Sequence, residues 1–335
     1  MRVLVTGAAG FVGAATTHRL LNRGDDVVGI DNLNPYYDPK LKAARIERVS
    51  NEDRFEFIQM DCADRDGMAN LFQNGKFDSV VHLAAQAGVR YSLEHPFAYL
   101  EANLNGFLTV LEGCRHHGIK HLVYASSSSV YGSNQNLPFS VGDNVDHPIS
   151  LYAATKKSNE HMAHVYAHLY GVPCTGLRFF TVYGPWGRPD MALFRFVESI
   201  LKNEPIPVFG NGEQTRDFTY IDDIVEGVMR CCDKPATANP DFDPLAPDPA
   251  TAAAPHRVFN IGNSYPTPLL RFIEVMEEAL GCEAMKDFQP MQPGDVVATA
   301  ANTAALEAWV GFKPSTPIET GVQRFADWYR SFYGV

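Results

Sequence analysis

The sequence predicts an α/β fold: a doubly wound parallel sheet with helices on both faces, followed by a smaller mixed α/β lobe. Three observations indicate this fold. Apolar strand-like runs alternate with helical patterns, a glycine-rich turn follows the first run, and frequent prolines break the second half into short elements. The strand-like runs are residues 3–6, 27–30, 55–58, 79–83, 121–125 and 175–180.

The change in pattern divides the chain into two parts. We expect residues 1–180 to form the first domain and residues 181–335 to form mainly a second lobe, with some segments returning to the first domain. Apolar residues at helical spacing from Leu269 to Leu280 predict an amphipathic helix in the second lobe. Residues 233–255 are rich in Ala, Pro and Asp, which predicts an exposed loop.

Composition and charge disfavour several classes of protein. The 335 residues include 28 Lys and Arg against 39 Asp and Glu, and the net charge of -11 disfavours binding to nucleic acid or anionic membranes. No apolar run approaches the roughly 18 residues of a membrane span, and the chain opens on a strand-like run rather than a signal peptide. His161, His164 and His168 share a helical face, but no acid or cysteine completes a metal site. We therefore expect a cytoplasmic protein without a metal.

The glycine-rich turn after the first run predicts a dinucleotide site. Gly7, Gly10 and Gly13 form a GxxGxxG motif, which lets the backbone approach a pyrophosphate at a helix N-terminus. The second run ends at Asp31, where a carboxylate accepts hydrogen bonds from both hydroxyls of an adenosine ribose. This carboxylate repels a 2′-phosphate, and no arginine follows within a dozen residues. The pattern predicts a Rossmann-type domain that binds NAD rather than NADP; a merely tight turn is the alternative.

A helical pattern after the fifth run carries Tyr152 and Lys156 on one face. A nearby ammonium and a positive nicotinamide favour the phenolate, so Tyr152 becomes an acid and base at neutral pH. The lysine would also hydrogen-bond the nicotinamide ribose. An ordinary surface helix is the alternative, and the position after the fifth run argues against it. The preceding serines, Ser126 to Ser129, supply hydroxyls that orient a substrate hydroxyl, unless they form only a polar turn.

These motifs resemble those of the extended short-chain dehydrogenase/reductases over nearly the whole chain. Three longer segments, residues 31–38, 87–92 and 183–191, are similar to the UDP-glucuronate 4-epimerases among the nucleotide-sugar epimerases. The resemblance implies that tightly bound NAD oxidises UDP-glucuronate at C4, giving a transient 4-keto sugar and NADH. Rotation of the sugar about its diphosphate link and return of the hydride give UDP-galacturonate and regenerate NAD in each cycle.

The resemblance also assigns roles to individual residues. Tyr152, Lys156 and Ser127 are the implied catalytic set, with Ser128 and Ser129 as alternatives to Ser127. The cofactor-binding set, which includes the residues argued above, is Gly7, Gly10, Phe11, Val12, Gly13, Asp31, Asn32, Asp61, Cys62, Leu83, Ala84, Ala85, Gln86, Asn103, Ser126, Tyr152, Lys156 and Phe179. The substrate-binding set is Arg90, Ser127, Ser128, Ser129, Tyr152, Thr181, Arg188, Met191, Phe194, Arg216 and Asp295.

A uronate makes a particular demand on its site. The 4-keto form of a glucuronate is a β-keto acid, which loses carbon dioxide readily when its carboxylate bond aligns with the carbonyl π system. Arg188 is the candidate that holds the carboxylate through two parallel hydrogen bonds, and Thr181 adds another. A loop-stabilising arginine and a packed threonine are the alternatives. The resemblance places Arg216 on the UDP diphosphate and Asp295, which ends a Gln-Pro-Gly-Asp sequence, on the uridine ribose.

Neighbouring activities remain as alternatives. Related dehydratases and decarboxylases typically carry an acidic residue in the segment that corresponds to residues 127–132, which has none here. A UDP-glucose 4-epimerase is the runner-up, and Arg188 with the preceding Pro-Trp-Gly weighs against it. A UDP-glucuronate decarboxylase or a catalytically silent NAD-binding protein ranks lower.

The family resemblance further implies a homodimer. Helices beginning near Pro96 and Leu151 would form a four-helix bundle with those of a partner, and the apolar Leu104, Leu108 and Leu111 fit such packing.

Overall fold

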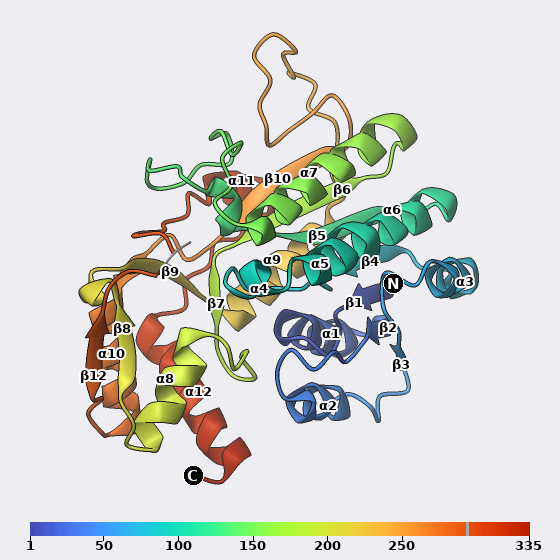
Figure 1. Ribbon diagram of the computed structural model, residues 1–335. Coiled ribbons are helices and arrows are strands. Elements are labelled where there is room, and N and C mark those ends of the chain that lie inside the picture. The colour runs from blue at the N-terminus through green and yellow to red at the C-terminus, as the bar shows by residue number, and fades with distance from the viewer. Residues whose placement is uncertain (293–294) are drawn as a thin grey trace.

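Seven parallel strands form the large sheet at the centre of the molecule (Figure 1). The computed structural model describes residues 1–292 and 295–335, so Pro293 and Gly294 of the predicted uridine segment lie outside the described residues. The order in the sheet is β10-β6-β5-β4-β1-β2-β3. The strands are β1 (Arg2–Thr6), β2 (Asp26–Asp31), β3 (Phe55–Gln59), β4 (Ser79–His82), β5 (His121–Ser127), β6 (Cys174–Phe179) and β10 (His256–Ile261).

Helices cover both faces of this sheet, which explains why its strands are apolar throughout rather than alternating. In β1, Val3 and Val5 point into the core on one face and Leu4 into the core on the other. Helices α1 (Phe11–Arg23), α9 (Ile221–Asp233) and α11 (Ala304–Val310) pack together over the first face. Helices α3 (Arg65–Gly75), α6 (Gly106–His116) and α7 (Leu151–Tyr170) pack over the second. The predicted doubly wound fold is confirmed.

The six strand-like runs of the sequence all become strands of this sheet, with ends that shift by at most two residues. The seventh strand, β10, was not predicted as a strand. It follows the long 233–255 connection and pairs in parallel with β6, from Cys174 opposite His256 to Phe179 opposite Ile261. Together with α9, it returns the chain from the small lobe to the large sheet.

The small lobe lies beside the carboxyl ends of the large sheet (Figure 1). Its strands make one sheet of order β11-β9-β7 and a separate parallel pair, β12-β8. These strands are β7 (Thr181–Tyr183), β8 (Ile206–Phe209), β9 (Thr215–Tyr220), β11 (Pro266–Pro268) and β12 (Lys286–Gln289). Its helices are α8 (Ala192–Leu201), α10 (Leu269–Leu280) and α12 (Ile318–Tyr333), and α10 is the amphipathic helix that the spacing predicted.

Short elements complete the chain. They are α2 (Pro39–Glu47), α4 (Tyr91–Glu94), α5 (Pro96–Tyr99), the π-helical turn η1 (Leu100–Asn105), and the 3₁₀ turns η2 (Ser128–Tyr131) and η3 (Gly210–Gly212). Residues 234–255 form an irregular excursion at the top of Figure 1, and Leu245 on it is 94% exposed. No helix within the described residues is long and apolar enough to cross a membrane.

A buried ion pair attaches α7 to the large sheet. Arg178 on β6 donates from Nε to Glu160 Oε1 at 2.8 Å and from Nη2 to Oε2 at 2.9 Å. Ser126 at the end of β5 donates to the same carboxylate at 2.7 Å. Burial alone would raise the pKa of Glu160, but the Arg178 guanidinium outweighs it and lowers the pKa to about 2. Glu160 therefore stays charged and fixes α7 against β5 and β6.

Removing the guanidinium should destabilise the fold strongly. We expect Arg178→Met to cost about 3–5 kcal/mol at pH 7, because it leaves a buried carboxylate without its counter-ion. Since the folded pKa of Glu160 is depressed, the pair stabilises the fold above the unfolded pKa of about 4.3. Its contribution is lost as pH falls toward the folded value of about 2.

Urea unfolding of Arg178→Met and of Lys202→Met measures this difference. Lys202 pairs with Glu198 on the solvent-exposed surface of α8, so its loss should cost far less stability than the loss of Arg178. A cost for Arg178→Met no larger than for Lys202→Met would show that the buried pair does not hold α7.

Candidate active site

A cleft of about 540 Å³ opens along the carboxyl ends of the large sheet and is closed on its other side by the small lobe. The chain reaches it at the end of five strands: Gly7 follows β1, Asp31 ends β2, Leu83 follows β4, Ser127 ends β5 and Phe179 ends β6. In doubly wound sheets, ligands bind in this position. The order of the strands in space, rather than in sequence, brings the predicted motifs together.

The glycine-rich turn is shaped for a close backbone approach. Gly7 has a φ of +70°, and a Cβ there would lie 2.7 Å from the Ala84 nitrogen. A Cβ on Gly13 would lie 2.0 Å from the Gly7 oxygen, so this glycine lets α1 pack on the turn. Gly10 caps α1 without a side-chain hydrogen bond, which leaves the first N–H groups of the helix facing the cleft. This arrangement fits a pyrophosphate.

Asp31 is held in place at the end of β2. Its Oδ2 accepts from the Ala9 nitrogen at 3.2 Å and its Oδ1 from the Leu33 nitrogen at 2.8 Å. Lys42 of α2 forms an ion pair with the same carboxylate at 3.4 Å. The sequence pattern did not predict this ion pair. Asp61 also lines the cleft and accepts from Asn32 Nδ2 at 2.8 Å. These polar groups form a site that fits the adenosine of NAD.

Nearly all of the predicted cofactor-binding residues line the cleft. Besides those described above, the lining includes Phe11, Val12, Cys62, Ala84, Ala85, Gln86, Ser126, Tyr152 and Lys156. Asn103 does not line it. Its side chain is 1% exposed and holds the Gln86 backbone, accepting at 2.8 Å and donating at 3.0 Å, while it also donates to Thr155. Asn103 supports the wall of the cleft from behind, and the direct cofactor contact expected of it stays a prediction.

Tyr152 and Lys156 project from the first turns of α7. Ser150 caps this helix by accepting from the Ala153 nitrogen at 3.1 Å. Lys156 donates to the Ala125 carbonyl at 2.9 Å, and burial lowers its pKa to about 8. Within the described residues this is its one hydrogen-bond partner, so two of its three donors face the cleft, where a ribose of NAD would accept them. Burial raises the pKa of Tyr152, while Ser127 and Arg188 act in the opposite direction.

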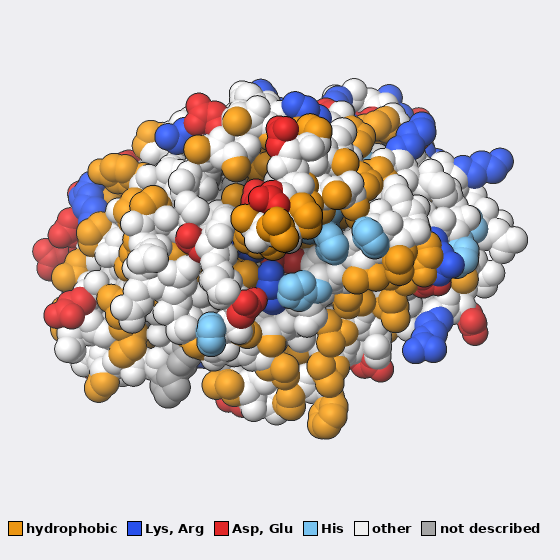
Figure 2. All heavy atoms as spheres, turned by 90° about the horizontal axis from the view of Figure 1, so that it is seen from above, with side chains coloured by type: hydrophobic (Ala, Val, Ile, Leu, Met, Phe, Trp, Pro, Cys, Tyr) orange, Lys and Arg blue, Asp and Glu red, His pale blue; other side chains and the backbone are white. Residues whose placement is uncertain are grey.

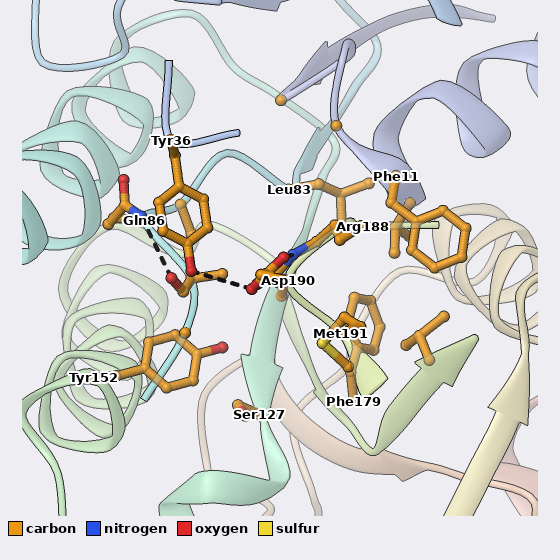
Figure 3. A pocket seen from close by; sticks show the side chains of 18 of the residues that line it. Phe11, Tyr36, Leu83, Gln86, Ser127, Tyr152, Phe179, Arg188, Asp190 and Met191 are labelled. Carbon is orange, nitrogen blue, oxygen red and sulfur yellow. Dashed lines mark hydrogen bonds and ion pairs between the residues drawn. The ribbon is translucent and has the colours of Figure 1, made fainter. Parts of the chain in front are cut away.

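The four serines have different surroundings. Ser126 is committed to Glu160 and belongs to the attachment of α7, although it also lines the cleft. Ser127 accepts from the Ser129 nitrogen at 3.2 Å and begins the η2 turn. Figure 3 shows Ser127 and Tyr152 approaching the same part of the cleft from β5 and α7. A hydrogen bond with Ser127 acts to lower the pKa of Tyr152, and Ser128 and Ser129 line the cleft farther along η2.

Arg188 enters the cleft opposite Tyr152, but it is not alone. Its Nε donates to Asp190 Oδ1 at 3.0 Å, and its Nη2 contacts the other carboxylate oxygen. Tyr36 donates to Asp190 as well, at 3.1 Å (Figure 3). Burial would lower the pKa of Arg188, but attraction to Asp190 raises it. Sequence reasoning missed Tyr36 and Asp190, although both lie in the segments that carry the family resemblance.

The small lobe supplies the rest of the predicted substrate set. Thr181 and Met191 line the cleft. Phe194 does not: it is 4% exposed and packs on aromatic rings of α12, 5.3 Å from Tyr329 and 5.9 Å from Phe325 between ring centres. The apolar face of α8 turns Phe194 into the core, and the substrate contact expected of it stays a prediction. Other cleft residues without a sequence prediction are Asn34, Tyr37, Met60, Ala87, Gly88, Val89, Ala102, Ala125, Phe180, Val182, Tyr183, Ala192, Leu193, Gln214, Phe218 and Leu269.

Cations also lie at the far end of the cleft. Arg216 on β9 donates to the carbonyls of Thr215 and Val297, both at 3.0 Å, and burial lowers its pKa. Arg90 pairs with Asp295 at 3.1 Å. Both arginines and Asp295 line the cleft, and their contacts with a nucleotide stay predictions. Within the described residues, no three His, Cys, Asp or Glu side chains gather as metal ligands.

Comparison with known proteins agrees with this geometry. Residues 3–262 match the model of the NAD dependent epimerase/dehydratase family. The chain belongs to this family. A probable UDP-glucuronate 4-epimerase of Rhizobium meliloti is 48% identical over 99% of this chain and 98% of its own length.

Solved structures of the family superpose over the whole fold. The UDP-glucuronic acid 4-epimerase of Bacillus cereus, in complex with UDP-glucuronic acid and NAD, has a TM-score of 0.87 at 34% identity, covering 99% of this chain and all of that one. The UDP-glucose 4-epimerase of Thermotoga maritima with UDP-glucose has a TM-score of 0.86 at 28% identity, with the same coverage. The fold alone therefore does not separate the two activities.

The positions of Tyr152 and Ser127 lead to a graded prediction. We expect Tyr152→Phe to lower turnover by about 10²–10⁴-fold, because it removes the acid and base, while the purified protein keeps its NAD. Ser127→Ala should cost more than Ser128→Ala or Ser129→Ala. Steady-state kinetics, with NAD released by acid and quantified, check both statements. Turnover of Tyr152→Phe near the wild-type rate would remove Tyr152 from this role.

Proposed function

We propose that this chain is a UDP-glucuronate 4-epimerase, which interconverts UDP-glucuronate and UDP-galacturonate. The observation that carries the proposal is the position of Arg188, a cation inside the cleft and across from Tyr152 and Ser127. The Rhizobium relative, at 48% identity over nearly the full length of both chains, supports the same substrate.

The cleft residues divide the chemistry between them. Tyr152 takes the proton of the sugar 4-hydroxyl, and Ser127 orients that hydroxyl and shares its proton. Lys156 keeps a positive charge next to the phenol, which favours the phenolate. Bound NAD supplies a reversible acceptor for the hydrogen at C4. Arg216, Arg90 and Asp295 hold the nucleotide end of the substrate while the sugar rotates about its diphosphate link.

Arg188 and Thr181 hold the carboxylate of the 4-keto sugar. In this β-keto acid, cleavage of the C5–C6 bond would send its electron pair toward the C4 carbonyl and release carbon dioxide, with C5 then taking a proton. Two parallel hydrogen bonds from a guanidinium keep the carboxylate out of the alignment that this cleavage needs. The substrate carboxylate has to compete with Asp190 for Arg188. When the substrate displaces Asp190 from Arg188, Asp190 keeps its hydrogen bond from Tyr36.

A neutral sugar is the second candidate, and one observation favours it. The Arg188 and Asp190 charges cancel in the present arrangement, so this part of the cleft carries no net positive charge for a carboxylate. A UDP-glucose 4-epimerase would fit such a site. A decarboxylase is disfavoured because residues 127–132 include no acid.

We further propose that residues 1–180, joined by α9, β10 and α11, form the NAD-binding domain and that the remaining residues form the substrate lobe. The protein would act as a homodimer in the cytoplasm. Exposed apolar side chains support the dimer: on the short helices around Pro96, Leu93 is 61% and Phe97 79% exposed, and on α7, Leu169 is 61% exposed. Figure 2 shows hydrophobic side chains and histidines on the face that is uppermost in Figure 1. The predicted position of Leu111 in the dimer interface is wrong, because Leu111 is fully buried in the protomer's own core.

Incubation of the purified protein with UDP-glucuronate, without added cofactor, tests the function. Proton NMR should show UDP-galacturonate, because NAD stays bound through the cycle. In Arg188→Ala we expect weaker use of the uronate and the appearance of a decarboxylated UDP-pentose product. Conversion of UDP-glucose but not of UDP-glucuronate, even with NAD supplied, would assign the neutral-sugar activity instead.

The dimer proposal predicts that Phe97→Asp separates the protomers, because a charge on the most exposed of these apolar side chains cannot be buried without a partner. Light scattering coupled to gel filtration should then give about 37 kDa rather than about twice that mass. The charge-matched control is Leu245→Asp on the 234–255 excursion, which should remain dimeric. A wild-type protein of 37 kDa would contradict the proposal.

A further inference from the structure

Arg45 on α2 is one of the most deeply buried side chains of the protein, with 1% of its surface exposed. All five of its N–H donors have acceptors. Nη1 donates to the Ala9 carbonyl at 3.0 Å and to the Tyr37 hydroxyl at 2.6 Å. Nε and Nη2 donate to the Trp186 carbonyl at 3.1 and 2.7 Å, and Nη2 also donates to the Gly187 carbonyl at 3.0 Å.

None of these partners is a carboxylate. Burying a guanidinium without a counter-ion is unfavourable unless every donor is satisfied. Here the backbone of two distant segments accepts four of the five hydrogen bonds, and the Tyr37 hydroxyl accepts the fifth. Ala9 belongs to the glycine-rich turn between β1 and α1, and Trp186 and Gly187 belong to residues 184–188, which we call the Arg188 turn. One side chain thus joins the turn that faces the cofactor to the turn that carries the proposed carboxylate ligand.

The Arg188 turn needs such support. Trp186 has a φ of +64°, a backbone conformation that residues other than glycine rarely adopt. Two side chains contact its indole: the guanidinium of Arg48, the C-cap residue of α2, lies 4.8 Å from the ring centre, and the ring of Phe332 on α12 lies 4.9 Å from it, between centres. Arg45 holds the carbonyl of the same residue. With both its ring and its carbonyl fixed, Trp186 determines the direction in which the chain leaves toward Arg188, two residues later.

We propose that Arg45 is a positioning residue for the carboxylate site: its guanidinium holds the Arg188 turn against the glycine-rich loop and so sets where Arg188 points in the cleft. This inference rests on the proposed function, because it assumes that Arg188 receives a uronate. By this inference α2 contributes to the selection of a uronate over a neutral sugar, a role that belongs neither to the glycine motif nor to the Tyr152 helix. Arg45 itself does not line the cleft.

The substitution Arg45→Lys separates this role from a purely stabilising one. Lysine keeps the charge but cannot span the Ala9 and Trp186 carbonyls with a planar fork. In a Tyr152→Phe background, calorimetry should show that UDP-glucuronate binds at least about tenfold more weakly, while UDP-glucose binding changes little, because a displaced Arg188 affects only the carboxylate. In otherwise wild-type protein, Arg45→Lys should release decarboxylated UDP-pentose.

Arg230→Lys is the matched control. Arg230 on α9 also donates to two backbone carbonyls, Val310 at 3.3 Å and Gly311 at 3.1 Å, but it does not line the cleft. It should leave the preference for the uronate and the products unchanged. If Arg45→Lys does not fold, Tyr37→Phe removes one acceptor of Arg45 and should shift the preference in the same direction by a smaller factor.

The outcomes distinguish a failure of the positioning role of Arg45 from a failure of the proposed epimerase activity. If Arg45→Lys lowers the melting temperature or the NAD content but keeps the wild-type preference and products, the positioning role is wrong and the epimerase stands. If Tyr37→Phe, used in its place, leaves the preference unchanged, the role is likewise overturned. If the wild-type protein neither binds nor converts UDP-glucuronate, the proposed function fails first, and the role of Arg45 fails with it.

Discussion

The ion pair between Glu160 and Arg178 attaches α7 to the large sheet, and the geometry of the site depends on that attachment. Glu160 lies one helical turn beyond Lys156, and Arg178 lies on the strand next to the one that ends in Ser127. Ser126 bonds to the same carboxylate. Tyr152 and Lys156 on α7 and Ser127 on β5 therefore rest on elements that a buried charged contact holds together.

The second constraint is the balance of charge around Arg188. In a protein with a net charge of -11, an anionic sugar nucleotide needs local cations, and the cleft places Arg90, Arg188 and Arg216 along its length. Two of these cations already face acids, Asp295 and Asp190. When the sugar binds, its carboxylate would thus replace the Asp190 carboxylate on Arg188, rather than enter a pocket whose positive charge has no counter-ion. Such an exchange favours ligands that place an anion at the right distance, because an uncharged group cannot replace Asp190.

Sequence patterns correctly predicted the elements whose signal lies within a short stretch of the chain. The six strand-like runs, the glycine-rich turn and the helix of Tyr152 and Lys156 follow from periodicity and spacing, because each signal lies within a few neighbouring residues. β10 was missed because a long irregular connection precedes it, and its place beside β6 depends on packing of the whole domain. The 233–255 loop was predicted correctly from composition alone.

The differences between the expected and the observed surroundings of the site residues have physical causes. Asn103 and Phe194 were assigned as contacts by family resemblance, and both face the interior, where orientation depends on packing that spacing does not reveal. Lys42 lies only 11 residues after Asp31, and it was missed because the prediction considered arginines and not lysines there. Arg45 was missed because its partners Ala9 and Trp186 lie far from it in sequence. Leu111 fitted a dimer stripe by spacing but belongs to the core.

The account claims that this cleft oxidises and then reduces C4 of one bound sugar. UDP-glucuronate labelled with deuterium at C4 tests that claim directly. After conversion in ordinary water, the account predicts UDP-galacturonate that keeps its deuterium at C4, as measured by NMR and mass spectrometry. Loss of the label to water, or its appearance at another carbon, would contradict the account.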